Sequence, residues 1–124
     1  SCNGDPIMVS ACTKLAKARL FINEADKLAA HEPQVFSRLV QSAELRRTGA
    51  DCYPHALVAR GLVDAVVDYD LKPYDYLPVS AVVDAAGGIM TDWQGKPLTL
   101  QSDGRTLTAA TPHLHAQLIE LVNS

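Results

Sequence analysis

The sequence has no excess of basic residues and no long apolar run. Its 11 lysine and arginine residues face 14 aspartate and glutamate residues, which gives a formal net charge of −3. Proteins that bind nucleic acid or an anionic membrane surface use a basic excess to neutralise phosphates, so we expect neither partner. No apolar run approaches the roughly 20 residues that a membrane-spanning helix needs. The N-terminal residues also lack a signal-peptide pattern, and we expect a cytoplasmic protein.

Cysteine is scarce, and the familiar catalytic motifs are missing. The three cysteines are an odd number without a CxxC pair, which favours reduced thiols over a disulfide framework or a structural zinc site. There is no P-loop, no GxGxxG segment that opens a helix and no Ser-His-Asp set. Trp93 and the tyrosines are too scattered to predict a stacking platform. The four histidines share no metal-ligand spacing, and we interpret them as surface residues: His31, His55, His113 and His115.

What the chain does contain is an alternation of strand-like and helix-like segments. At 124 residues it is long enough for one ordinary core. Apolar runs predict strands over 7–10, 18–22, 45–48, 63–67, 89–92 and 106–110. Helical periodicity predicts helices over 33–43, 50–60, 75–86 and 112–122, with Thr111 as the N-cap of the last. The polar residues 23–31 predict an exposed loop.

This alternation is typical of an α/β protein. We predict a layered α/β/α fold with a mostly parallel sheet of about five strands and helices on both faces. The Asn3-Gly4 pair favours a tight hairpin, yet only two residues precede it. We therefore interpret residues 1–10 as the remnant hairpin of a preceding domain and residues 11–124 as a C-terminal α/β domain.

Asp75 lies where a buried strand, after a short turn, is followed by an apolar helix. Such positions often hold ligand chemistry in α/β proteins. Two interpretations are open. Asp75 can cap the helix by accepting a backbone N–H, or its carboxylate can act as a hard-cation ligand or general base. Asp68 and Asp70 precede it closely, which favours the second interpretation modestly.

A second candidate site is the segment Arg46-Arg47-Thr48-Gly49-Ala50-Asp51. A glycine between a strand and a helix N-terminus, with arginine nearby, can hold an anion through backbone N–H groups and a guanidinium. A solvated charge pair beside a tight turn is the alternative.

Several segments together resemble a known family. Tyr74-Asp75-Tyr76, followed by Asp84-Ala-Ala-Gly-Gly-Ile-Met-Thr-Asp-Trp-Gln-Gly, resembles the C-terminal motif of the inositol monophosphatase superfamily. Gly49-Ala-Asp-Cys-Tyr and Asp70-Leu-Lys-Pro-Tyr-Asp are most similar to its histidinol-phosphate phosphatase branch. Cys2-Asn-Gly-Asp-Pro-Ile is similar to a hairpin late in the family's first domain. The resemblance covers essentially the whole chain and implies the C-terminal half of a sugar-phosphatase-type fold.

The resemblance implies a Mg²⁺-dependent phosphomonoesterase that uses a metal-activated water on a small phosphate ester. It implies that Asp75 is the catalytic, metal-binding aspartate and that Asp68 is an acid that recognises substrate. Arg46, Arg47, Gly49, Ala50 and Asp51 would form the substrate-binding turn. The full-length form would be a homodimer.

The family's other metal ligands belong to a first half that has no counterpart in this chain. A single carboxylate does not hold Mg²⁺ against its hydration shell, so we expect the chain alone to be inactive. Activity would require the missing N-terminal half or a second chain. Two alternatives stay open: a non-catalytic binding or interaction module, and a general sugar-phosphate or nucleotide phosphatase of the same superfamily.

Overall fold

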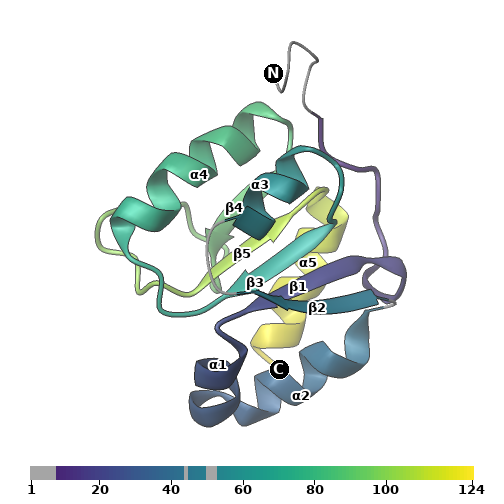
Figure 1. Ribbon diagram of the computed structural model, residues 1–124, viewed down its shortest axis with the longest axis vertical. Helices are drawn as coiled ribbons and strands as arrows, with labels where there is room; N and C mark the ends of the chain where they lie inside the picture. The colour runs from purple at the N-terminus through teal and green to yellow at the C-terminus, as the bar shows by residue number, and fades with distance from the viewer. Residues whose placement is uncertain (1–7, 44, 50–52) are drawn as a thin grey trace.

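The computed structural model describes residues 8–43, 45–49 and 53–124, with the backbone alone for residues 45–49, 53 and 56. Five strands form one sheet in the order β2-β1-β3-β5-β4 (Figure 1). The strands are β1 (Arg19–Asn23), β2 (Leu45–Gly49), β3 (Ala65–Asp68), β4 (Ile89–Asp92) and β5 (Thr106–Ala109). The helices are α1 (Ala25–His31), α2 (Pro33–Ser42), α3 (Tyr53–Ala59), α4 (Pro73–Ala85) and α5 (Pro112–Val122), and a 3₁₀ turn, η1, spans Leu15–Lys17.

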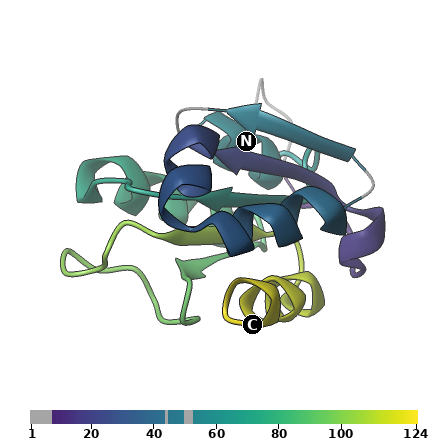
Figure 2. The same cartoon turned by 90° about the horizontal axis from the view of Figure 1, so that it is seen from below.

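Helices cover both faces of the sheet, which confirms the predicted α/β/α layering (Figures 1 and 2). The larger apolar core joins α1, α2 and α5 to one face of the sheet through buried side chains such as Leu28, Leu39 and Leu118. On the other face, Val58 of α3 and Tyr76 and Val83 of α4 are buried. None of the helices in the described ranges is long and apolar enough to cross a membrane.

The sheet is mixed in its pairing. β1 pairs in parallel with β2 and with β3, whereas β5 pairs antiparallel with β3 and with β4. Four strands therefore point in one direction and β5 points in the other. The predicted sheet is mostly parallel in strand direction, but two of its four strand pairs are antiparallel. All four residues of β3 are buried: the apolar residues 65–67, within the predicted strand, and the polar Asp68 that follows them.

The predicted exposed loop over residues 23–31 is wrong, because α1 occupies most of it. This helix is short, its apolar residues other than Leu28 are alanines, and it follows Glu24 directly. Leu28 is its one buried residue and is fully enclosed in the larger core. A single large apolar side chain sets no clear helical period in the sequence, so tertiary packing determines this helix.

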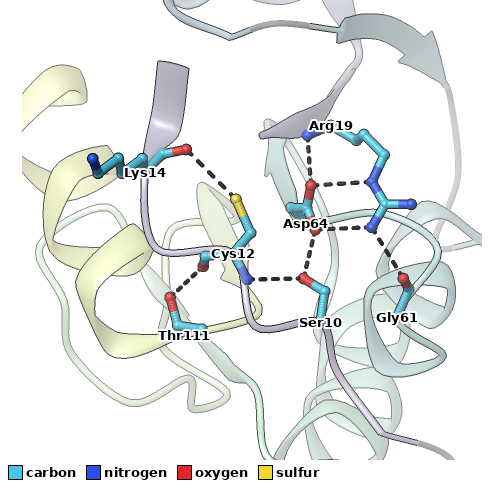
Figure 3. A network of polar contacts seen from close by, with 7 residues as sticks. All are labelled: Ser10, Cys12, Lys14, Arg19, Gly61, Asp64 and Thr111. Carbon is cyan, nitrogen blue, oxygen red and sulfur yellow. Dashed lines mark hydrogen bonds and ion pairs between the residues drawn. The ribbon is translucent and has the colours of Figure 1, made fainter. Parts of the chain in front are cut away.

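The N-terminal segment is tied to the edge of the sheet where β1 and β3 begin (Figure 3). Residues 8–10 carry no strand, contrary to prediction, and Ile7 lies outside the described residues. Ser10 Oγ donates to Asp64 Oδ1, and Arg19 donates to the same carboxylate from its backbone N–H (2.7 Å) and its guanidinium (3.0 and 3.1 Å). Thr111 Oγ1 donates to the Cys12 carbonyl at 2.7 Å. The predicted domain boundary at residue 10 stays a prediction.

Candidate functional site

Two of the predicted site residues, Asp68 and Gly49, lie at the opposite edge of the sheet, where the parallel strands end. β1 and β3 are adjacent and parallel, so their carboxyl ends, Asn23 and Asp68, lie side by side. The chain leaves β1 toward α1 on one face and leaves β3 toward α4 on the other. A crevice between strands whose connections diverge in this way is where open α/β sheets bind ligands.

The backbone turns sharply after both strands. Glu24 follows β1 with φ 52°, and Asp70 follows β3 by two residues with φ 64°. These left-handed conformations are costly for residues with a side chain, and they concentrate at functional sites. Lys27 Nζ lies 2.9 Å from Asp70 Oδ2 and 3.7 Å from Glu24 Oε2, and Lys72 Nζ lies 3.4 Å from Asp70 Oδ1. The hydrogen bond from Lys27 holds the pKa of Asp70 below its usual range.

Asp75 lies in the first turn of α4, which starts two residues earlier than predicted. Pro73 takes the first helical position and Asp75 the third. The half-exposed carboxylate reaches back, and its Oδ2 accepts the Lys72 N–H at 3.1 Å. The capping interaction that the sequence suggested is therefore present, although not from the N-cap position. Among the described contacts, this hydrogen bond uses only the Oδ2 atom of Asp75. A carboxylate has further acceptor sites that a ligand can use.

Asp68 is enclosed, with only 1% of its surface exposed. Its Oδ2 accepts hydrogen bonds from Asn23 Nδ2 (2.8 Å) and His55 Nε2 (2.9 Å), and its Oδ1 accepts the Tyr69 N–H (2.8 Å). The interpretation of His55 as a surface residue is wrong, because the imidazole is fully buried. A substrate contact by Asp68 stays a prediction, and here the carboxylate is occupied by the chain's own donors.

The predicted substrate-binding turn reaches the same edge through its backbone. β2 contains Arg46, Arg47 and Gly49, and the register places Gly49 beside Asn23 of β1. The side chains of Arg46 and Arg47 are not described, and Ala50 and Asp51 lie outside the described residues. Their roles in substrate binding stay predictions.

The described residues do not form a complete site for a divalent cation. Within the described ranges, no group of three or more His, Cys, Asp or Glu side chains is placed to hold a metal ion. Mg²⁺ demands near-octahedral oxygen coordination, usually with carboxylates and several waters. The described part of the chain therefore does not fit Mg²⁺ by itself, and it offers Asp75 as one partly exposed carboxylate.

An aromatic cluster that the sequence did not predict lies at the same edge of the sheet. Tyr69 follows β3, Trp93 follows β4 and Arg105 precedes β5. The two rings lie 6.1 Å apart, and the Arg105 guanidinium lies 5.7 Å from the Tyr69 ring and 5.5 Å from the Trp93 ring. Arg105 also pairs with Glu32 at 3.3 Å. Residues from three separate loops share no sequence spacing, so only the topology brings them together.

A surface hollow of about 370 Å³ lies elsewhere, between α4 and β4. Ser80 and Asp84 of α4, Thr91 of β4 and Leu98 are among its lining residues. It includes none of the acids at the ends of β1 and β3, so we assign the candidate site to these strand ends and not to this hollow.

Comparison with known proteins supports a single family. The chain matches the profile of the inositol monophosphatase family over residues 1–124. It is 32% identical over 125 residues to the "Bifunctional phosphatase IMPL2, chloroplastic" of Arabidopsis thaliana, covering 95% of this chain and 36% of that protein. It is 30% identical to a histidinol-phosphatase of Chlorobaculum parvum, covering 98% of this chain and 47% of that protein.

The solved structures agree. An inositol monophosphatase from Zymomonas mobilis superposes with a TM-score of 0.91 at 30% identity, covering 98% of this chain and 48% of that one. The chain therefore spans between about a third and a half of the length of the relatives and solved structure described above.

Proposed function

The chain belongs to the inositol monophosphatase family, and we propose that it contributes the Asp75 part of the active site of a Mg²⁺-dependent phosphomonoesterase. The observation that carries this proposal is the position of Asp75. Its carboxylate is half-exposed in the first turn of α4, the helix that follows β3. Because the described residues supply no complete cation site, the remaining ligands would come from outside them.

We propose a small phosphate monoester as substrate. The names of two relatives, a bifunctional phosphatase and a histidinol-phosphatase, support this class, and histidinol phosphate is the first candidate. Inositol phosphate is the second, because "Inositol monophosphatase 2" of Rattus norvegicus is 30% identical over 98% of this chain. Arg46, Arg47, Gly49, Ala50 and Asp51 remain our proposed substrate-binding turn, supported by the position of the β2 backbone beside Asn23.

The test is Mg²⁺-dependent phosphate release from histidinol phosphate, inositol phosphate, a sugar phosphate and a nucleotide. We expect no turnover by this chain alone, because one carboxylate does not hold Mg²⁺. Joined to the remaining half of the Chlorobaculum parvum relative, the chain should release phosphate. Asp75→Asn should abolish that activity. Asp84→Asn, which changes an exposed acid on the same helix, is the matched control and should leave it intact.

Full activity in the Asp75→Asn variant would overturn the assignment of Asp75 as a ligand. Turnover by the isolated 124 residues would overturn the requirement for further ligands. A profile that favours a sugar phosphate or nucleotide over histidinol phosphate would support the general phosphatase.

We also propose that α4 is covered in the functional assembly, either by a further part of the enzyme or by a second copy of the chain. The apolar residues of α4 are spread around the helix and not confined to one face, and a helix of that kind is normally buried. Yet Tyr74 is 79% exposed and Val82 is 45% exposed. We expect the isolated chain to self-associate, and size-exclusion chromatography with light scattering checks this. If the parent chain and Tyr74→Lys are both monomers at high concentration, the proposal that α4 is covered is contradicted.

A non-catalytic binding module is the second candidate function. The lack of a three-ligand cation site among the described residues favours it for the chain in isolation. It predicts that the intact mass of the natural polypeptide equals that of these residues plus an initiating methionine. A larger natural polypeptide with phosphatase activity would exclude it.

A further inference from the structure

A buried polar cluster lies under α3, next to the candidate site. Its members are fully or almost fully enclosed, with at most 1% of their surface exposed: Asn23, His55, Asp68, Thr106 and Thr108. Toward the other end of the same face of the sheet the buried side chains are apolar, including Val63, Val66 and Ala110. Burying polar groups is costly unless they are hydrogen-bonded, so this cluster has to be accounted for group by group.

Hydrogen-bond donors surround the Asp68 carboxylate. Its two oxygens accept from three N–H donors, on Asn23, His55 and the Tyr69 backbone. A carboxylate only accepts, so His55 must present a proton on Nε2.

Thr108 holds the other side of the imidazole. Its Oγ1 lies 2.7 Å from His55 Nδ1. A threonine hydroxyl can donate or accept, because it rotates to suit its partner, so the contact forms with either role of Nδ1. His55 is thus fixed between β3 and β5 at both ring nitrogens, and it is fully buried. The ring orientation is determined by packing and by two hydrogen bonds.

The cluster joins the two segments that carry the candidate site. His55 belongs to α3, which follows the proposed substrate-binding turn. Asp68 ends β3, and through the Tyr69 N–H it holds the start of the connection that leads to Asp70 and Asp75. An imidazole–carboxylate contact between these two elements fixes one segment relative to the other.

We infer that His55 is a positioning residue, which acts through the Asp68 carboxylate to set the β3–α4 connection that carries Asp75. Asp68 is then the link between His55 and that connection. The effect on catalysis rests on the proposed phosphatase function, whereas the structural coupling does not.

The test compares two histidine–threonine pairs in the same chain. His115 Nε2 also lies 2.7 Å from a threonine hydroxyl, that of Thr91, but it belongs to α5 on the other face of the sheet. His55→Phe removes the donor to Asp68 and keeps a planar ring of similar size. His115→Phe makes the same chemical change away from the site. His55→Gln keeps an amide N–H that can reach the Asp68 carboxylate.

The readout is amide hydrogen exchange of Tyr69, measured relative to Val66 of β3 in the same molecule. This ratio cancels a uniform loss of stability. We expect His55→Phe to raise the Tyr69-to-Val66 ratio about tenfold, the effect of losing one hydrogen bond to a charged group. His115→Phe should leave the ratio unchanged, and His55→Gln should restore it. NMR of the imidazole nitrogens should show the proton on Nε2 at neutral pH.

Equal ratios in the His55→Phe and His115→Phe variants would overturn the inference, and so would a neutral ring with its proton on Nδ1. If His55→Phe does not fold, Thr108→Val serves the same comparison against Thr91→Val. These outcomes involve no turnover, so they are independent of the phosphatase assay. In the active joined enzyme, His55→Phe should lower kcat and His55→Gln should restore it.

Discussion

Glu24 and Asp70 contact the same ammonium group, that of Lys27, at 3.7 and 2.9 Å. Both have positive φ, and within the described ranges they are the non-glycine residues that do. One follows β1 and the other follows β3, so Lys27 bridges the turns that follow these two adjacent strands. The chain thus keeps strained backbone at the edge where the candidate site lies.

The left-handed turn at Glu24 can be tested with a matched pair of variants. Glu24→Gly and Glu24→Ala both remove the 3.7 Å contact to Lys27, but only glycine adopts φ 52° without a steric cost. We expect the glycine variant to be about 1 kcal/mol more stable than the alanine variant. Urea unfolding of both variants measures the difference, and equal stabilities would mean that the turn carries no strain.

Lys27 controls the ionisation of Asp70. The hydrogen bond and the charge of Lys27 hold the pKa of Asp70 below its usual range. In Lys27→Met, the pKa of Asp70 should rise toward its ordinary value, and carboxyl-carbon NMR titration would detect the change. Lys17→Met, which changes a lysine at the opposite edge of the sheet, is the control and should have no effect on Asp70.

The two interpretations of Asp75 make different predictions for stability. If Asp75 acts as the acceptor of the Lys72 N–H, Asp75→Ala should lower the free energy of unfolding by about 1 kcal/mol. Asparagine keeps an oxygen acceptor, so Asp75→Asn should lose much less. Because Asp75→Asn is also expected to abolish phosphatase activity, a stable but inactive variant would separate ligand binding from helix capping. Thermal unfolding supplies the stability values.

The Asp64 network predicts an acid-dependent loss of stability. Burial opposes the charge on Asp64, but hydrogen bonds from Arg19 and Ser10 outweigh it and hold the pKa of Asp64 below its usual range. A carboxyl with a depressed folded pKa stabilises the protein above its unfolded pKa, about 3.9, and this stabilisation is lost as the pH falls through the folded value. In Asp64→Asn, the free energy of unfolding should be about 2 kcal/mol lower at neutral pH. It should also depend less on pH in the acid range.

Urea unfolding of Asp64→Asn and of the parent chain, measured between pH 2 and 7, checks this. The pH dependence of unfolding in Ser10→Ala should lie between those of Asp64→Asn and the parent chain. An unchanged acid limb in Asp64→Asn would show that other carboxyls determine acid unfolding.

His115 predicts a second pH dependence, closer to neutrality. Burial lowers the pKa of His115 below its usual value of about 6.5. The unfolded chain therefore takes up a proton before the folded chain does, and stability falls as the pH drops below about 6.5. In His115→Gln this part of the pH profile should be flat. His113→Gln, which changes an exposed histidine on the same helix, is the control and should keep the parent profile.

Local sequence signals predicted the elements whose boundaries depend on nearby residues. β4 was predicted to the residue, because Gly87-Gly88 ends the preceding helix and a polar turn follows Asp92. α5 begins as predicted, and Thr111 Oγ1 accepts the Leu114 N–H at 3.2 Å. Pro112 at the first helical position and a capping threonine act within one turn of the chain, so no tertiary contact is needed to recognise them.

By itself, the sequence determined the alternation of strands and helices, the acids that follow β3 and the resemblance to one phosphatase family. Only the tertiary structure decided that α1 is a helix held by Leu28, that His55 is buried on Asp68, and that Tyr69, Trp93 and Arg105 meet. The physical reason is the range of the interactions. Capping, periodicity and turns act over a few residues, whereas burial and ion pairing depend on which strands the sheet places side by side.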